Sequence, residues 1–307
     1  MALIAGPTAS GKSDLAVALA VELQRQGRSA VVLNADSAQV YRDLRVLSAR
    51  PSKDEMQGIE HRLFGTWDGA EPCSAAEWAA AAKREVENGQ LAGQVPILVG
   101  GTGLYLRTLL GGIAAVPPIV PAVRDAVRAL PLSEAYAALQ REDAQRAALL
   151  HPSDSARVTR ALEVVRSTGK PLAHWQAERV GGIANVVELF PVIILPDREW
   201  LYRRCDLRFE RMIERGAQAE VEALLARHLA PTMPVMRAIG VPEIAGWLRG
   251  EWSREQALAR GQQATRNYAK RQYTWFRRQP PVEWPRLSEN SPSLTRFETL
   301  FRYERLT

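Results

Sequence analysis

The stretch Gly6-Pro7-Thr8-Ala9-Ser10-Gly11-Lys12-Ser13 matches the pattern G-x-x-x-x-G-K-[ST] at every position. An apolar run at residues 2–5 precedes it and predicts a short strand, and residues 15–21 follow it with a helical period. The glycines allow a tight turn that directs several backbone N–H groups at one point, and the helix that begins near Gly11 adds its positive end. The stretch therefore predicts a phosphate-binding loop between a strand and a helix.

Two side chains of this loop have predicted roles. Lys12 supplies a cation to the terminal phosphate oxygens, and the Ser13 hydroxyl contacts a Mg²⁺ ion that bridges those oxygens. The pattern predicts binding of a polyphosphate or a pyrophosphate, but it does not define the reaction.

The composition predicts a soluble protein of the cytoplasm. The chain has 307 residues, of which 46% are hydrophobic and 24% are charged, as in ordinary globular proteins of about two domains. Cys73 and Cys205 lie far apart and lack metal-ligand spacing, so neither a disulfide framework nor a zinc site is expected. No apolar run approaches the ~18 residues of a membrane span, and the early phosphate loop leaves no room for a signal peptide.

Positive charge is concentrated near the C-terminal end. The formal net charge is +6, and the segment between Glu251 and Gln279 contains seven basic residues and two acidic ones. Such an excess fits either a surface that binds a polyanion or a solvated basic helix.

Polar residues follow two further predicted strands. The strand at residues 29–34 is followed by Asp36, and the strand at residues 95–99 by Gly100-Gly101-Thr102-Gly103. Because ligands gather at the carboxyl ends of parallel strands, Asp36 is expected near the phosphate loop, where it could orient magnesium, act as a general base or cap a helix. The glycines and the Thr102 hydroxyl favour contact with a substrate over plain NTP hydrolysis.

The remaining pattern predicts an α/β fold, in which a P-loop NTPase-like parallel sheet flanked by helices carries a helical insertion domain. After the stiff connection at residues 117–121 come amphipathic helical segments without a strand pattern, and strand signal returns at residues 186–195. We therefore expect residues 1–115 to form the first part of the core, 116–185 the insertion, and 186–307 the rest of the core with basic helices. Several arginines of the insertion fit either phosphate contacts or solvated ion pairs, namely Arg124, Arg157, Arg160 and Arg166.

Two later helices carry arginines or aromatic residues on one face. In the helix at residues 201–212, Arg204, Arg208 and Arg211 share a face, which an anion or nearby carboxylates would neutralise. In the basic helix at residues 264–278, we interpret Tyr268 and Trp275 as core anchors in preference to base-stacking platforms. From about residue 280 the sequence predicts a loosely tethered tail.

Several motifs together resemble the tRNA dimethylallyltransferase family, and they occur in the family's order along nearly the whole chain. They are GPTASGKS at 6–13, DSAQVY at 36–41, PILVGGTGLY at 96–105, RALEV at 160–164, TGK at 168–170, AIG at 238–240 and ATRNYAKRQYTW at 264–275. The resemblance implies transfer of a prenyl group from dimethylallyl diphosphate to N6 of adenine 37 of tRNA, next to the anticodon. It also implies Mg²⁺ as cofactor and the tRNA anticodon stem-loop as partner; we expect a monomer and no membrane partner.

The resemblance also implies roles for individual residues. Asp36 matches the general base, Thr102 a tRNA-contacting residue near the reacting centre, and Arg208 a cation that neutralises the leaving diphosphate held by residues 6–13. Ser37, Ala38 and Gln39 match the segment that lines the pocket of the flipped adenine together with Asp36. The matching tRNA contacts of the insertion are Arg124, Arg157 and Arg160.

The sequence departs from the family pattern at Ala156 and at Val241-Pro242, and it lacks the Cys/His pairs of a zinc finger, which indicates a bacterial-type member. Two other functions remain open on the residues alone. One is a kinase of a small molecule or nucleotide on the same core, and the other is an RNA-binding protein that has lost catalysis.

Overall fold

The computed structural model describes residues 1–289 and 294–302 and contains two compact units. The core joins Met1–Leu109 with Ala184–Thr307, and the insertion spans Leu110–Ile183. The insertion expected from the sequence, residues 116–185, shares most of its residues with the second unit.

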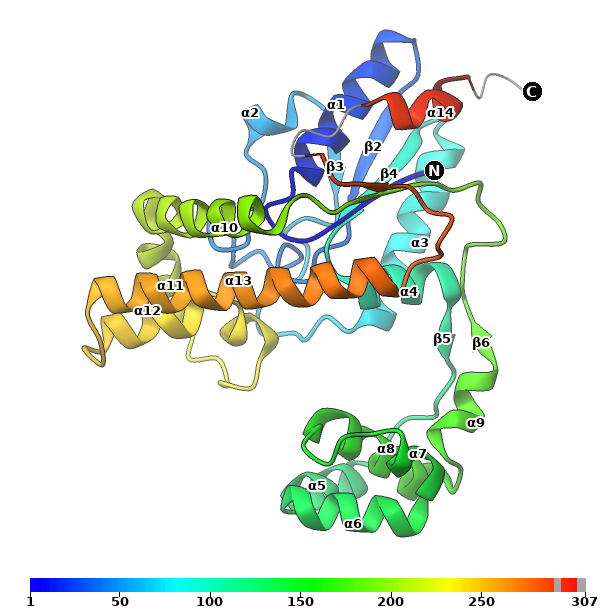
Figure 1. Cartoon of the computed structure of the whole chain (residues 1–307), viewed down its shortest axis with the longest axis vertical. Coiled ribbons are helices and arrows are strands. Elements are labelled where there is room, and N and C mark those ends of the chain that lie inside the picture. Colours follow the sequence, from blue (N-terminus) through cyan, green and yellow to red (C-terminus); the bar gives the residue numbers. More distant parts are fainter. Residues whose placement is uncertain (290–293, 303–307) are drawn as a thin grey trace. The chain divides into compact units, whose positions relative to one another are not determined.

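A six-stranded sheet forms the centre of the core, in the order β3-β2-β4-β1-β7-β8 (Figure 1). Every neighbouring pair of strands in it is parallel, which confirms the predicted α/β fold with a parallel sheet. The strands are β1 (Ala2–Ala5), β2 (Ala30–Asn34), β3 (Glu60–Arg62), β4 (Val95–Gly100), β7 (Phe190–Ile194) and β8 (Arg286–Leu287).

Helices cover both faces of this sheet because its central strands β1, β2, β4 and β7 are apolar on both sides. Helix α1 (Lys12–Arg25) shares one buried cluster with Ile4 of β1 and its same-face neighbours. Helix α3 (Ala75–Leu91) lies on the opposite face, where the fully buried Trp78 donates its indole N–H to the Asn34 carbonyl oxygen at 3.0 Å. The strand ends are thus held between two helical layers.

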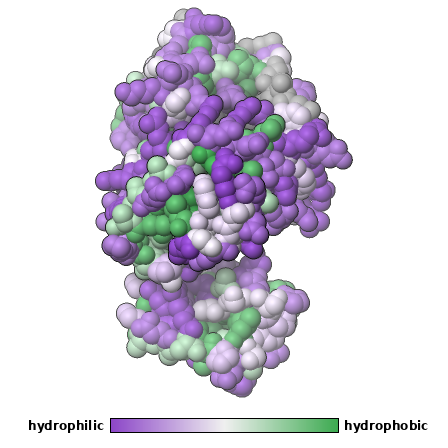
Figure 2. All heavy atoms as spheres, turned by 90° about the vertical axis from the view of Figure 1, so that its left-hand side faces the viewer, coloured by the Kyte–Doolittle hydropathy of each residue, from purple (hydrophilic) through white to green (hydrophobic). Residues whose placement is uncertain are grey.

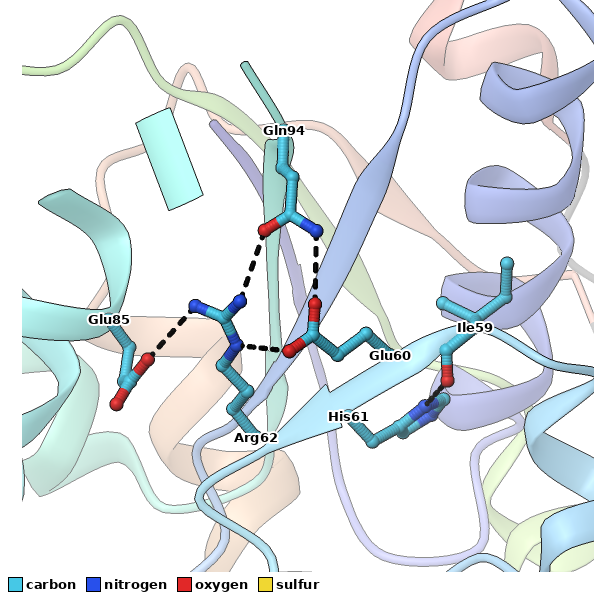
Figure 3. Close-up of polar contacts among 6 residues, drawn as sticks. All are labelled: Ile59, Glu60, His61, Arg62, Glu85 and Gln94. Atoms are coloured by element: carbon cyan, nitrogen blue, oxygen red, sulfur yellow. Dashed lines mark hydrogen bonds and ion pairs between the residues drawn. The ribbon is translucent and has the colours of Figure 1, made fainter. Parts of the chain in front are cut away.

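The edge strand β3 is fixed by charged side chains (Figure 3). Arg62 bonds to the carboxylates of Glu60 and Glu85 at 2.7 and 3.1 Å and to the Gln94 amide oxygen at 3.2 Å. These bonds tie β3 to α3 and to the start of β4, and charge on an edge strand also opposes pairing with other chains.

The segment after residue 280 is not a loose tail in its described part, so that prediction was wrong. Strand β8 extends the sheet beside β7, and the chain then forms η3 (Leu294–Phe297) and α14 (Glu298–Arg302). Phe297 and Leu300 are buried in the cluster of α1, and the Arg28 guanidinium donates to the Leu300 carbonyl oxygen at 2.8 Å.

A further helical layer of the core follows β7, and its two longest helices pack against each other. The Arg266 guanidinium of one pairs with the Asp206 carboxylate of the other at 2.5 Å. The helical elements are α10 (Arg198–Met212), a π-helical turn (Ile213–Ala217), α11 (Gln218–Leu225), η2 (Pro234–Arg237), α12 (Val241–Leu248) and α13 (Arg254–Arg278). Two short helices, α2 (Lys53–Met56) and α4 (Gly103–Gly111), follow β2 and β4.

The insertion has its own hydrophobic core, in which Val127, Leu139 and Leu162 are almost fully buried. Its helices are α5 (Pro121–Ala129), α6 (Leu132–Glu142), α7 (Ala144–Ala148), α8 (Ser155–Thr168) and α9 (Leu172–Ala177). It also contains an antiparallel pair of two-residue strands, β5 (Ile113–Ala114) and β6 (Arg179–Val180), which the sequence pattern did not predict.

Polar side chains dominate the face of the protein in Figure 2, with smaller hydrophobic areas between them. In the described part of the chain, no helix has both the length and the apolar composition that crossing a bilayer requires.

Candidate active site

The phosphate loop lies between β1 and α1, as its pattern predicts, and lines a cavity of about 550 Å³. Gly11 has φ of 87° and ends the loop in a left-handed conformation that glycine adopts without strain. The helix therefore starts at Lys12 with its first N–H groups at the cavity. This arrangement suits an anion, because free N–H groups and the positive helix end act together.

Arginines of α10 contact the same loop. Arg204 Nε donates to the Ala9 carbonyl oxygen at 2.9 Å, and Arg208 Nη2 donates to Thr8 Oγ1. The predicted arginine face of this helix is thus turned to the phosphate loop instead of being neutralised by Asp206, which pairs with Arg266. The other arginines that line the cavity are Arg45, Arg50, Arg211 and Arg215.

Lys12 is buried in this site, and Arg208 is half-buried. Lys12 is 9% exposed, and burial lowers the pKa of its ammonium group to about 8, although the Asp36 charge partly opposes the shift. Burial also lowers the pKa of Arg208, whose Nε has no hydrogen-bond partner in the described structure. No carboxylate in the described part of the chain forms an ion pair with either cation. Because cations that are partly or fully removed from water are unfavourable without a counter-charge, the site favours an anionic ligand that pairs with both.

Asp36 and Thr102 follow the ends of the neighbouring strands β2 and β4, and the Thr102 N–H donates to the Ala35 carbonyl oxygen at 3.1 Å. A Cβ at Gly100 would lie only 2.1 Å from the Ala35 carbonyl oxygen, so the two strand ends are in direct contact. Thr102 Oγ1 accepts a bond from the Ser37 backbone N–H at 2.9 Å and donates to Ser37 Oγ at 3.2 Å. Asp36 is 9% exposed, and its Oδ1 accepts from the Ala38 N–H at 2.9 Å. Its carboxylate is therefore held in a fixed orientation.

A second cavity, of about 310 Å³, is lined by Asp36, Ser37 and Ala38 of this junction. Thr8, Asp36 and Arg208 line both cavities. The aromatic side chains of the second cavity are Tyr41, Tyr105, Phe209 and Tyr268. Its size and lining suit a planar organic group.

Tyr268 was misassigned from the sequence as a core anchor. It is half-buried and lines the second cavity, and the Arg271 guanidinium lies over its ring at 5.6 Å from the centroid. Burial, followed by the Asp36 charge, raises the pKa of its phenol, so the hydroxyl remains a neutral donor. The i, i+3 spacing of Tyr268 and Arg271 within a basic segment was the one signal for this position.

The other predicted residues fall into two groups. Ser37 and Ala38 line the second cavity, whereas the Gln39 amide donates to the Ser48 and Ala49 carbonyl oxygens, both at 3.0 Å, and so shapes the following loop. Exposed arginines of the insertion, which is the other compact unit, form the second group. They are Arg124 on α5 and Arg157 and Arg160 on α8.

Sequence reasoning missed Cys73 and Tyr105 as parts of the second cavity. The Tyr105 hydroxyl donates to the Cys73 carbonyl oxygen at 3.3 Å, and both residues line the cavity. The Tyr105 ring also stacks on Trp78 at 4.4 Å between centroids. An aromatic residue directly after a glycine-rich strand end was the available signal.

These features define a P-loop α/β protein in which an anion cavity meets an organic-ligand cavity at the ends of the strands. Comparison with known proteins then identifies the family. The family model described as "IPP transferase" matches residues 39–279, and the chain belongs to this family.

Similar proteins carry consistent names. A tRNA dimethylallyltransferase of Erythrobacter litoralis is 66% identical over 304 residues, which cover 99% of this chain and 96% of that protein. One of Novosphingobium aromaticivorans is 63% identical over 278 residues, covering 90% of this chain and 99% of that protein. Both alignments extend over nearly the whole length of each partner.

Solved structures agree with these relatives. The full-length tRNA isopentenylpyrophosphate transferase of Bacillus halodurans is 29% identical, with a TM-score of 0.68 over 98% of this chain and 94% of that one. A eukaryotic dimethylallyltransferase acting on tRNA is 28% identical, with a TM-score of 0.75 over 90% of this chain and 69% of that one.

Proposed function

We propose that this protein transfers the dimethylallyl group of dimethylallyl diphosphate to N6 of adenine 37 of tRNA, giving N6-(dimethylallyl)adenosine and diphosphate. The observation that carries the proposal is the sharing of Thr8, Asp36 and Arg208 by the two cavities. A donor in the larger cavity and a base in the smaller one would meet at the Asp36 carboxylate.

The larger cavity suits the diphosphate of the donor. The loop at residues 6–13 presents N–H groups, and Lys12 and Arg208 add positive charge close to where the leaving group would lie. As the carbon–oxygen bond of the donor breaks, negative charge grows on the diphosphate while the allyl carbon becomes cation-like. Fixed donors and cations at that place stabilise the charge in the transition state.

A Mg²⁺ ion is the cofactor that this donor chemistry implies. Mg²⁺ takes few protein ligands when it binds phosphate oxygens and keeps several waters. The Ser13 hydroxyl at the exposed start of α1 fits such a ligand, and the described residues contain no cluster of three or more His, Cys, Asp or Glu for a protein-only cage. When bound, the ion would neutralise charge on the diphosphate.

The smaller cavity suits a flipped adenine. An exocyclic amine in a stacked base is inaccessible, so the base must leave the stack, which costs least in a single-stranded loop. The Tyr41, Tyr105 and Tyr268 rings can enclose the base, and Ser37 offers a hydroxyl group. Thr102 orients that hydroxyl by donating to it at 3.2 Å. Asp36 takes the N6 proton as the new N–C bond forms, so that the modified amine is left neutral and the diphosphate leaves with the electrons of the broken C–O bond.

Basic surfaces support a polynucleotide partner. Among the described residues, no carboxylate pairs with the side chains of Lys270, Arg271 or Arg278 on α13, which line an open groove with Trp275. A cationic surface beside a half-buried aromatic ring suits single-stranded RNA. The exposed Arg124, Arg157 and Arg160 of the insertion are the other proposed contacts to the anticodon stem-loop.

The test is product analysis with the full chain. We would incubate it with Mg²⁺, dimethylallyl diphosphate and an unmodified tRNA that carries adenines at 36–38, digest the RNA and search for a prenylated adenosine by mass. The proposal expects a product that disappears when adenine 37 is replaced. In Asp36→Asn, turnover should fall by at least about 100-fold, with tRNA binding retained, since general-base catalysis contributes about 10²- to 10⁴-fold.

Three outcomes would contradict parts of this proposal. ATP-dependent phosphorylation of a metabolite without an RNA product would favour a kinase. Binding of tRNA without turnover, in both wild type and Asp36→Asn, would favour an RNA-binding protein. Equal turnover of the two proteins would remove Asp36 from the role of base.

A further inference from the structure

A buried amide on α13 connects two loops of the site. Gln272 is 5% exposed, and its Oε1 accepts from the Thr8 backbone N–H at 2.8 Å. Its Nε2 donates to the Gly101 carbonyl oxygen, also at 2.8 Å. One side chain thus bonds to the loop after β1 and to the loop after β4, although both loops lie more than 170 residues away in sequence.

The Gln272 amide links the two loops just beyond the point where the pairing of β1 with β4 ends. The pairing of β1 with β4 ends at Ala5 opposite Gly100, and the last direct backbone bond runs from the Gly6 N–H to the Gly100 carbonyl oxygen at 3.4 Å. Beyond this point Gln272 alone, among the described residues, is hydrogen-bonded to both Thr8 N–H and Gly101 C=O. It therefore continues the link between two chain segments that the strands no longer pair.

The two loops belong to different substrates under the proposed function. Thr8 lines both cavities, and its hydroxyl accepts the bond from Arg208 on the diphosphate side. Gly101 immediately precedes Thr102, which bonds to Ser37 in the lining of the proposed adenine pocket. The Gln272 amide thus lies between the part of the site that holds the donor and the part that orients the acceptor.

We propose that Gln272 is a positioning residue for the transfer step, which sets the separation of the donor loop and the Thr102 loop. This inference rests on the proposed function. Gln272 lines neither of the two cavities, so it acts through Thr8 and Gly101 instead of touching a substrate. Each substrate keeps its own binding groups without it, but the reacting atoms would no longer be held at the same separation.

The proposal predicts a loss of kcat without a matching rise in KM. In Gln272→Met the side chain keeps its length and loses both hydrogen bonds. Because misplacement of reacting groups by about 1 Å can cost about 100-fold in rate, we expect kcat to fall about 10- to 100-fold. The KM values for dimethylallyl diphosphate and for tRNA should each stay within about threefold, since Lys12, Arg208 and the aromatic walls remain.

A matched control lies on the same helix. The Gln262 amide donates to the Asp206 carbonyl oxygen of α10 at 3.3 Å, and Gln262 lines neither cavity. Gln262→Met therefore removes one bond between the helices by the same substitution, and its kcat should equal that of the wild type. A similar loss of kcat in both variants would overturn the proposal, because helix packing alone would then explain it.

A second variant covers the case in which Gln272→Met fails to fold. In Gln272→Asn the side chain is shorter by one methylene group and cannot reach both partners. Its kcat should therefore also fall, but less than that of Gln272→Met. Combined with Thr102→Ala, it should cost less than about threefold further, because the group that it positions is already gone.

The outcomes separate this inference from the function on which it rests. A full additional loss in the Thr102→Ala background, or an unchanged kcat in a folded Gln272 variant, would refute the positioning role alone. Absence of prenylated product from the wild-type protein would instead refute the proposed function.

Discussion

The buried cation of the phosphate loop should make diphosphate binding sensitive to pH. Burial lowers the pKa of Lys12 from 10.5 to about 8, with the Asp36 charge opposing the shift and the Arg208 charge adding to it. Asp14 and Cys205 also act on this group, and both raise its pKa. A bound diphosphate requires the charged ammonium, so binding takes up a proton above pH 8 and weakens as the pH rises.

The magnitude follows from the fraction of protonated Lys12. With a pKa of about 8, roughly nine-tenths of this group is charged at pH 7 and roughly one-tenth at pH 9. The dissociation constant of pyrophosphate should therefore rise about tenfold over this range, which corresponds to about 1.4 kcal/mol.

Titration calorimetry with pyrophosphate and Mg²⁺ at fixed ionic strength measures this change. Lys12→Arg serves as the control because its guanidinium stays charged at both pH values, while the ligand ionises identically with both proteins. Between pH 7 and pH 9, the dissociation constant of the wild type should rise about tenfold more than that of Lys12→Arg. The same pH dependence in both proteins would refute the assignment of the proton to Lys12.

Two further changes test parts of the structure outside the phosphate loop. The Glu220 carboxylate accepts from the backbone N–H groups of Arg45, Val46 and Leu47, whose loop lines both cavities. Glu220→Gln should thus raise the KM for dimethylallyl diphosphate severalfold in steady-state assays, whereas Glu222→Gln on the same helix should not; equal KM values would contradict this role. Leu300→Ala should lower the free energy of unfolding by about 2–5 kcal/mol in urea titrations, because Leu300 is buried against α1; a loss below about 1 kcal/mol would show that α14 does not stabilise the core.

The centre of the fold and the core of the site could be predicted because both depend on local patterns. The phosphate loop requires a strand before it and a helix after it, and β1 and α1 occupy those places. Parallel strands bring their carboxyl ends to one edge, which is why Asp36 and Thr102 could be expected close to the loop although 66 residues separate them in sequence. Their roles in catalysis stay predictions.

Other parts could not be predicted because they depend on tertiary contacts. Tyr268 has helical spacing relative to Trp275, and such spacing does not distinguish a core face from a cavity wall. Strand β8 has only two residues, and bonds such as that from the Leu195 N–H to the Leu287 carbonyl oxygen at 2.7 Å hold it beside β7. Two residues are too few to show the alternating pattern of a strand, so the sequence predicted a tail in this part of the chain.

The paired strands β5 and β6 have a consequence for how the insertion can change. Ile113 lies opposite Val180 and Ala114 opposite Arg179, so the chain segments that lead into and out of the helical unit run side by side. Because the two ends of the unit are neighbours, an insertion, exchange or deletion in the gene can change this unit while a short peptide still connects the flanking segments of the core. The reach of an RNA-modifying enzyme could in this way diverge between lineages while its chemistry is inherited unchanged.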